Sequence, residues 1–76
     1  MGQAQKRVEI INQRKSEKLT QQEVANKAGI SRSFYAMLEA GQRGCSIHTW
    51  AKLGCALNLT EGQLLAIILK DEKQNE

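Results

Sequence analysis

Apolar residues recur every three or four positions along most of this 76-residue chain, with polar and charged residues between them. In the middle of the chain the pattern comprises Val24, Ala25 and Ala28, and it continues with Tyr35 and Leu38. An apolar stripe with this spacing is typical of a helix that buries one face. The chain contains no proline and little clustering of β-branched residues, which also favours helices over strands.

Capping signals mark where these helices begin and end. Thr20 and Glu23 form a capping box, in which each side chain accepts a hydrogen bond from a backbone N–H that the first helical turn leaves free. Thr60 and Gln63 repeat this arrangement further along the chain. Residues that can adopt the left-handed conformation of a helix end stand at three places, which are Gly29, Gly41 and Asn58.

Spacing and caps together predict a single all-α domain, residues 1–76, that folds as a compact five-helix bundle. The expected helices cover about 4–16, 21–28, 32–40, 47–57 and 61–69, and a frayed charged tail follows over 70–76. The residues that the spacing assigns to the buried faces of the last two helices are Ile47, Trp50, Leu53, Leu57, Leu64 and Leu65.

The net charge of +3 is unevenly distributed along the chain. Residues 1–43 contain eight Lys and Arg against four Glu, a balance of +4, whereas residues 44–76 contain three Lys against four acids, a balance of −1. A basic segment of this kind suits contacts with nucleic-acid phosphates. The alternative interpretation is a solvated surface that is simply basic.

Several classes of function receive no support from the sequence. No segment approaches the roughly 20 apolar residues of a membrane span, and no apolar signal core begins the chain, so we expect a cytoplasmic protein without membrane contact. A single His, with no nucleophile motif and no glycine-rich phosphate loop, argues against an enzyme or a bound cofactor. Cys45, His48 and Cys55 include no paired ligand motif, so no metal is expected. Cys45 and Cys55 are ten positions apart, mostly along one expected helix, so we expect a separation of about 14–15 Å, which is too far for a disulfide.

Residues 19–41 predict two short helices joined by a tight turn, and here the sequence resembles the Cro/phage-repressor type of helix-turn-helix regulators, also called the xenobiotic-response-element type. The matching residues are Leu19-Thr20-Gln21, Glu23, Ala25, Ala28-Gly29-Ile30-Ser31-Arg32-Ser33, Leu38-Glu39 and Gly41, and then Ser46-Ile47, Leu53, Ala56-Leu57 and Leu64-Leu65. The resemblance implies a lambda-repressor-like DNA-binding domain whose recognition helix, over 32–40, enters the major groove.

The resemblance also implies roles for individual residues. The base-contacting positions are Arg32, Ser33 and Met37, where an Arg can bond guanine in bidentate fashion and a Met can touch a thymine methyl group. The DNA-backbone positions are Gln21, Ser31, Phe34 and Arg43. Four of these residues have an alternative. Arg32 could be a solvated residue at the helix start and Gln21 a surface amide, whereas Phe34 could be buried against the preceding helix and Met37 could pack at the edge of the core.

Three further features follow from the family pattern. Arg14 and Glu39 occupy positions where the family often has an ion pair between the first and third helices, which would set the angle of the recognition helix. Ala36 stands where a hydroxyl is common in the family, and Ala40 where an amide or charged residue is common. Two possible backbone contacts are therefore missing from the third helix.

The function implied is sequence-specific binding of double-stranded DNA by a small stand-alone bacterial or phage transcriptional regulator. A homodimer on a pseudo-palindromic operator is expected, with the apolar residues Ile67, Ile68 and Leu69 at the dimer interface. Two alternatives also bind DNA: the antitoxin of a toxin–antitoxin pair and a restriction–modification controller protein. The alternative from outside this class is a structural helical module that binds no DNA.

Overall fold

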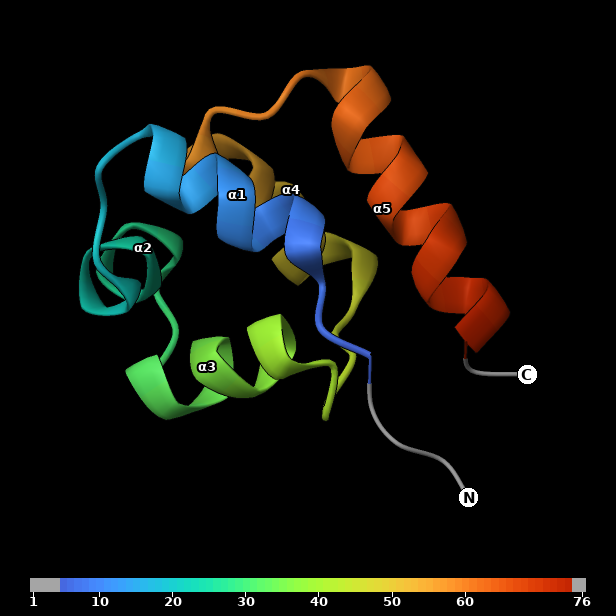
Figure 1. Cartoon of the computed structure of the whole chain (residues 1–76), viewed down its shortest axis with the longest axis horizontal. Helices are drawn as coiled ribbons and strands as arrows, with labels where there is room; N and C mark the ends of the chain where they lie inside the picture. Colours follow the sequence, from blue (N-terminus) through green and yellow to red (C-terminus); the bar gives the residue numbers. More distant parts are fainter. Residues whose placement is uncertain (1–4, 75–76) are drawn as a thin grey trace.

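The computed structural model describes residues 5–74, which form five α-helices and no strand (Figure 1). The helices are α1 (Val8–Ser16), α2 (Gln21–Ala28), α3 (Arg32–Ala40), α4 (Ile47–Leu57) and α5 (Glu61–Gln74). The all-α, five-helix fold expected from the sequence is thereby confirmed. The bounds of α2, α3 and α4 agree with those predicted, because each of these helices is capped by residues adjacent to it in sequence.

The first helix begins at Val8, later than the predicted start near residue 4, which itself lies outside the described residues. The preceding segment runs instead along the end of α3, where the Arg7 backbone N–H donates to the Glu39 carbonyl oxygen at 2.8 Å. Gly41 makes room for this approach. A Cβ atom built on Gly41 would overlap the Gln5 carbonyl oxygen and lie 2.7 Å from its carbon. Packing against α3 therefore replaces the first turn that the sequence predicted.

The last helix is longer than predicted. It continues to Gln74, so the expectation of a frayed tail from residue 70 is wrong as far as residue 74, and residues 75–76 lie outside the described part. The extension contains Lys, Asp, Glu and Gln but neither Gly nor Pro, so the local sequence contains no stop signal. Lys70 also forms an exposed ion pair with Glu9 of α1 at 2.9 Å.

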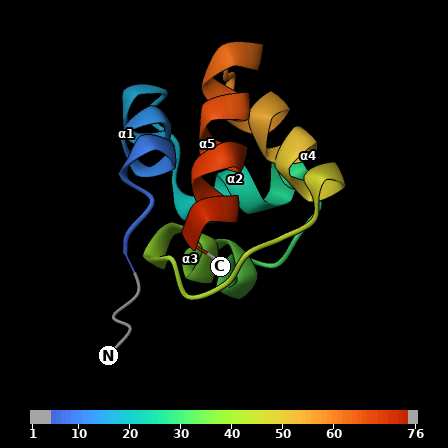
Figure 2. The same cartoon turned by 90° about the vertical axis from the view of Figure 1, so that its right-hand side faces the viewer.

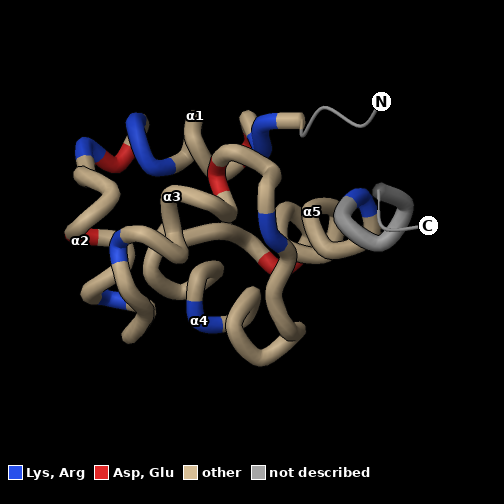
Figure 3. Tube along the Cα trace, turned by 90° about the horizontal axis from the view of Figure 1, so that it is seen from below, with Lys and Arg blue, Asp and Glu red and all other residues tan. Residues whose placement is uncertain are grey.

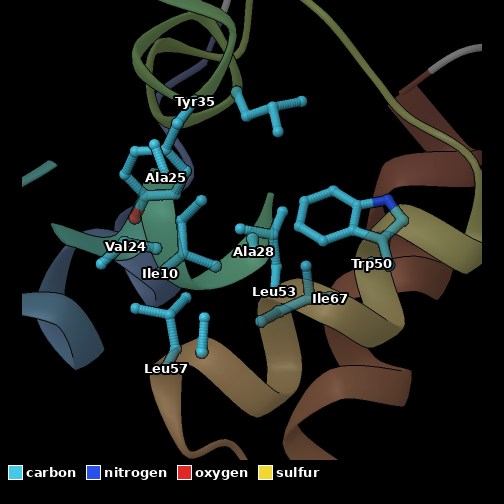
Figure 4. Close-up of a cluster of buried hydrophobic side chains, with 11 residues drawn as sticks. Ile10, Val24, Ala25, Ala28, Tyr35, Trp50, Leu53, Leu57 and Ile67 are labelled. Atoms are coloured by element: carbon cyan, nitrogen blue, oxygen red, sulfur yellow. The ribbon is translucent and has the colours of Figure 1, made fainter. Parts of the chain in front are cut away.

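The core lies where α2 packs against both α3 and α4, and Figure 4 shows its side chains converging from all five helices. Tyr35 and Trp50 are the largest of its fully buried members. α5 packs against α4 across Gly54, where an added Cβ would lie 2.9 Å from a methyl carbon of Leu64. Burial of this one apolar cluster supplies the main stabilisation of the fold.

The apolar face of α5 differs from the expected one. Ile67 is only 5% exposed and belongs to the core, whereas Leu65, expected inside, is 56% exposed. Ile47, expected on the inner face of α4, is 67% exposed at its first position. Helical spacing defines apolar stripes, but the neighbouring helices decide which member of a broad stripe is covered.

Candidate nucleic-acid interface

The turn between α2 and α3 is built by local hydrogen bonds. The predicted capping box forms at the start of α2, with Glu23 N–H donating to Thr20 Oγ1 at 3.1 Å and Thr20 N–H donating to Glu23 Oε1 at 2.8 Å. α2 ends at Gly29, whose φ of 72° places it in the left-handed region. Ser31 then caps α3 by accepting from the Phe34 N–H at 3.1 Å. α3 therefore starts only a few residues after α2 ends, in a new direction.

One side of α3 is open to solvent. Arg32 and Ser33 are exposed and Met37, one turn beyond Ser33, is half-buried, whereas Tyr35 and Leu38 on the opposite side are fully buried. The predicted base-contacting residues thus share one accessible side of the helix. In Figure 1, α3 lies at the bottom of the molecule with no other helix below it. A helix in this position can enter a DNA groove without rearrangement of the fold.

The buried carboxylate of Glu39 is the centre of a hydrogen-bond network on this side of the molecule. Glu39 is 5% exposed, and it accepts from Arg14 Nε at 2.6 Å and from Gln21 Nε2 at 2.8 Å. The ion pair that the family pattern implied between α1 and α3 is therefore present. Arg32 in turn donates to Gln21 Oε1 at 3.3 Å. The network connects α1, α2 and α3 and orients Arg32, the first residue of α3.

Electrostatics keeps Glu39 ionised inside the protein. Burial by itself would raise the pKa of Glu39, but the hydrogen bond from Arg14, with the bond from Gln21 and the Arg14 charge, outweighs burial and lowers the pKa. The hydrogen bond with Glu39 likewise raises the pKa of Arg14. Since Glu39 is the only acidic residue of α3, the open side of this helix carries no negative charge.

The loop after α3 brings a cation next to Phe34 in the first turn of that helix. The Arg43 guanidinium lies over the ring of Phe34, 5.5 Å from its centroid. This stacked arrangement restricts both side chains. The Phe34 ring is half-buried and packs against the core, whereas its contact with DNA stays a prediction. Two of the four positions expected to contact the DNA backbone therefore adjoin each other.

Arg7 is a structural residue that sequence reasoning did not identify. It is 7% exposed, and its guanidinium donates to the Leu38 carbonyl at 2.6 Å and the Arg43 carbonyl at 2.7 Å. It also lies over the Trp50 ring, 5.3 Å from the centroid. Arg7 thereby fastens the Arg43 loop to the core. In the sequence, Arg7 follows Lys6 within the expected first helix and resembles any solvated charge, so no signal marked it.

The residues expected at a dimer interface do not all reach the surface. Ile67 is buried in the core, so assigning it to an interface is wrong for this fold. Ile68 is half-buried, and Leu69 is 51% exposed. Leu65 lies one turn before Leu69 and is also exposed, so these two residues form the accessible apolar stripe of α5.

Among the side chains that the structure describes, those of residues 5–70, no three or more His, Cys, Asp or Glu come together in a way that could hold a metal ion. None of the helices described is long and apolar enough to cross a membrane.

Comparison with known proteins relates this geometry to a family. The family model of helix-turn-helix proteins matches residues 10–64. The restriction-modification controller protein C.AhdI from Aeromonas hydrophila is 30% identical, with a TM-score of 0.70 over 74% of this chain and 85% of that one. No curated protein matches the chain.

Two more distant structures share the fold. The restriction-modification controller protein C.Esp1396I is 18% identical, with a TM-score of 0.71 over 88% of this chain and 87% of that one. The clp gene regulator ClgR from C. glutamicum is 22% identical, with a TM-score of 0.70 over 79% and 78%. The family match over most of the chain agrees with the capped α2–turn–α3 unit and its open recognition helix. The chain therefore belongs to the Cro/phage-repressor-type helix-turn-helix family of DNA-binding regulators.

Proposed function

We propose that this protein is a sequence-specific regulator of transcription that binds double-stranded DNA with α3 in the major groove. The observation that carries the proposal is the open side of α3, where Arg32, Ser33 and Met37 are accessible while Glu39, the one acid of the helix, is buried and paired. Base edges are read by Arg32 and Ser33, and Met37 contacts a thymine methyl group. The chemistry is binding only, without catalysis.

The DNA backbone is contacted from the rim of this surface. Ser31 and Phe34 lie in the first turn region of α3, and Arg43 lies over Phe34. Gln21 begins α2, where free backbone N–H groups favour a phosphate. Its Oε1 already accepts from Arg32, so Gln21 also orients the residue that reads the bases.

Selection of bound sites from a random DNA pool provides the first test, because it reports the operator sequence and the half-site spacing together. Titration of Arg32→Ala against the selected operator and against random DNA then separates base reading from phosphate contact. We expect the preference for the operator to fall by about 1–3 kcal/mol for each half-site. If affinity for both DNAs falls equally, Arg32 is a phosphate contact, and a wild-type protein without salt-dependent DNA binding would refute the whole proposal.

The active form is proposed to be a homodimer on a pseudo-palindromic operator, with half-sites about 34 Å apart. Leu65 and Leu69 on α5 and Ile47 at the start of α4 are half or more exposed, and an apolar surface is unfavourable in water. Figure 2 shows α5 nearest the viewer, with the first turn of α4 to its right and α3 at the bottom of the molecule. Two copies that join through this side leave both recognition helices free.

Sedimentation equilibrium tests the dimer. Leu69→Glu is expected to weaken self-association at least tenfold, whereas the exposed polar substitution Lys52→Gln on α4 leaves it unchanged. A wild-type chain that stays monomeric at high concentration would exclude this assembly.

A restriction–modification controller protein is the second candidate within the same class. The observation that favours it is the 30% identity to the controller protein C.AhdI, which extends over 85% of that chain. Selected operators that lie upstream of genes for a methyltransferase and an endonuclease would support this role, and operators next to unrelated genes would exclude it.

A further inference from the structure

A hollow of about 300 Å³ opens beside the recognition helix, between α1, α2 and α3. α3 forms one wall with the small side chains of Ala36 and Ala40, and α1 forms the other with Ile11 and Lys15. Lys6 closes the end where the N-terminal segment passes. In the family pattern, Ala36 and Ala40 replace residues with polar side chains, so α3 itself offers no donor along this wall.

The charges around the hollow are unbalanced. Arg14 and Glu39 line its floor, but they form an ion pair at 2.6 Å, and a second guanidinium nitrogen of Arg14 donates to the Leu19 carbonyl at 3.0 Å. Lys6 and Lys15 are both exposed, and across the described residues neither ammonium has an ion-pair or hydrogen-bond partner. The hollow therefore offers two uncommitted cations, with no uncommitted acid among its lining residues.

The position of these cations matches the direction of the DNA. Figure 3 views the molecule from the side of α3 and shows Lys and Arg spaced along α1 and the segment before it, next to α3. A duplex that holds α3 in its major groove places a phosphate backbone on either side of that helix. One backbone meets the Arg43 loop beside Phe34, and the hollow, which Gln21 at the start of α2 also lines, lies on the α1 side of the same helix.

We propose that Lys6 and Lys15 each bind a backbone phosphate of the DNA at this hollow, as substitutes for the polar side chains that α3 lacks at positions 36 and 40. This inference rests on the proposed DNA-binding function and adds a contact from outside the helix-turn-helix unit. The small side chains of Ala36 and Ala40 allow the backbone to approach closely, and the two ammonium groups supply the charge. Such a contact adds affinity and positions α3 without reading the sequence.

The test uses the full chain and a fluorescent duplex of random sequence, about 30 base pairs long. Affinity is measured by anisotropy between 50 and 200 mM salt for the wild type, Lys6→Gln and Lys15→Gln, with Lys52→Gln on α4 as the matched control. Each phosphate contact contributes about 0.9 to the slope of log K against log[salt]. Lys6→Gln and Lys15→Gln are each expected to reduce the slope by about 0.9 per protomer bound, which corresponds to roughly a threefold smaller loss of affinity over this salt range.

The outcomes separate this inference from the function on which it rests. The contact is supported if the slope falls in Lys6→Gln and in Lys15→Gln but is unchanged in Lys52→Gln. The variant Lys15→Arg, which keeps the positive charge, is then expected to show the wild-type slope. Wild-type binding that depends on salt, with the same slope in both hollow variants, overturns the contact and leaves the proposed function intact. A wild-type chain that does not bind the duplex overturns both. All three lysines are exposed, so circular dichroism is expected to show unchanged folding.

Discussion

Replacing Gly41 by Ala tests how the segment before α1 is held against the recognition helix. Gly41 ends α3 with a φ of 76°, and a Cβ there would overlap backbone atoms of Gln5. Gly29 is a matched control, since its φ of 72° is nearly the same but a Cβ built on it meets nothing within 4 Å. Both variants bear the strain of a left-handed Ala, about 1–2 kcal/mol, and only Gly41→Ala must also displace the segment.

The extra loss follows from the hydrogen bonds that the segment makes. Displacement breaks the bond from the Arg7 N–H to the Glu39 carbonyl, worth about 1 kcal/mol, and weakens those from the Arg7 guanidinium to two further carbonyls, worth about 1.5 kcal/mol each. We therefore expect Gly41→Ala to lose about 2–4 kcal/mol more than Gly29→Ala. For a domain of this size, each kcal/mol lowers Tm by about 4–8 °C.

Urea unfolding followed by circular dichroism measures both losses at one protein concentration, because a dimer would make stability depend on concentration. The slope of free energy against urea is expected to stay the same, so the midpoints report stability directly. Equal losses in Gly41→Ala and Gly29→Ala would show that the segment does not pack against α3 in solution. Arg7 would then not hold the Arg43 loop against the core in solution.

Two further predictions concern stability and assembly. Glu39 has a pKa below its ordinary value of 4.5, so its ionised form stabilises the fold above that pH, and this contribution is lost as the pH falls through the lowered pKa. Glu39→Gln should therefore lower the free energy of unfolding by about 3 kcal/mol at pH 7. In urea titrations below about pH 4.5, the difference in stability between this variant and the wild type should shrink. A difference that is independent of pH would contradict the ion pair with Arg14. Ile67→Ala should cost about 2–5 kcal/mol of stability, whereas Leu69→Ala should mainly weaken the dimer in sedimentation; the reverse pattern would contradict their burial.

The middle of the fold could be predicted from the sequence because its signals are local. A capping box joins Thr20 to Glu23 over three residues, and a left-handed Gly29 ends α2 whatever lies around it. The apolar spacing likewise identified Tyr35 and Leu38 as the buried side of α3, which left Arg32 on the open side. Local hydrogen bonds and helical geometry therefore determined α2, α3, α4 and the face proposed to meet DNA.

Only the tertiary structure decided what depends on contacts between distant residues. The place of Arg7 against Leu38 and Arg43 joins positions more than 30 residues apart, and no spacing rule reports such a contact. The choice of Ile67 over Leu65 as the buried residue of α5 depends on where that helix meets α4. Sequence patterns encode the shape of each helix, while burial is a property of the surfaces that helices share, and those surfaces exist only once the chain has folded.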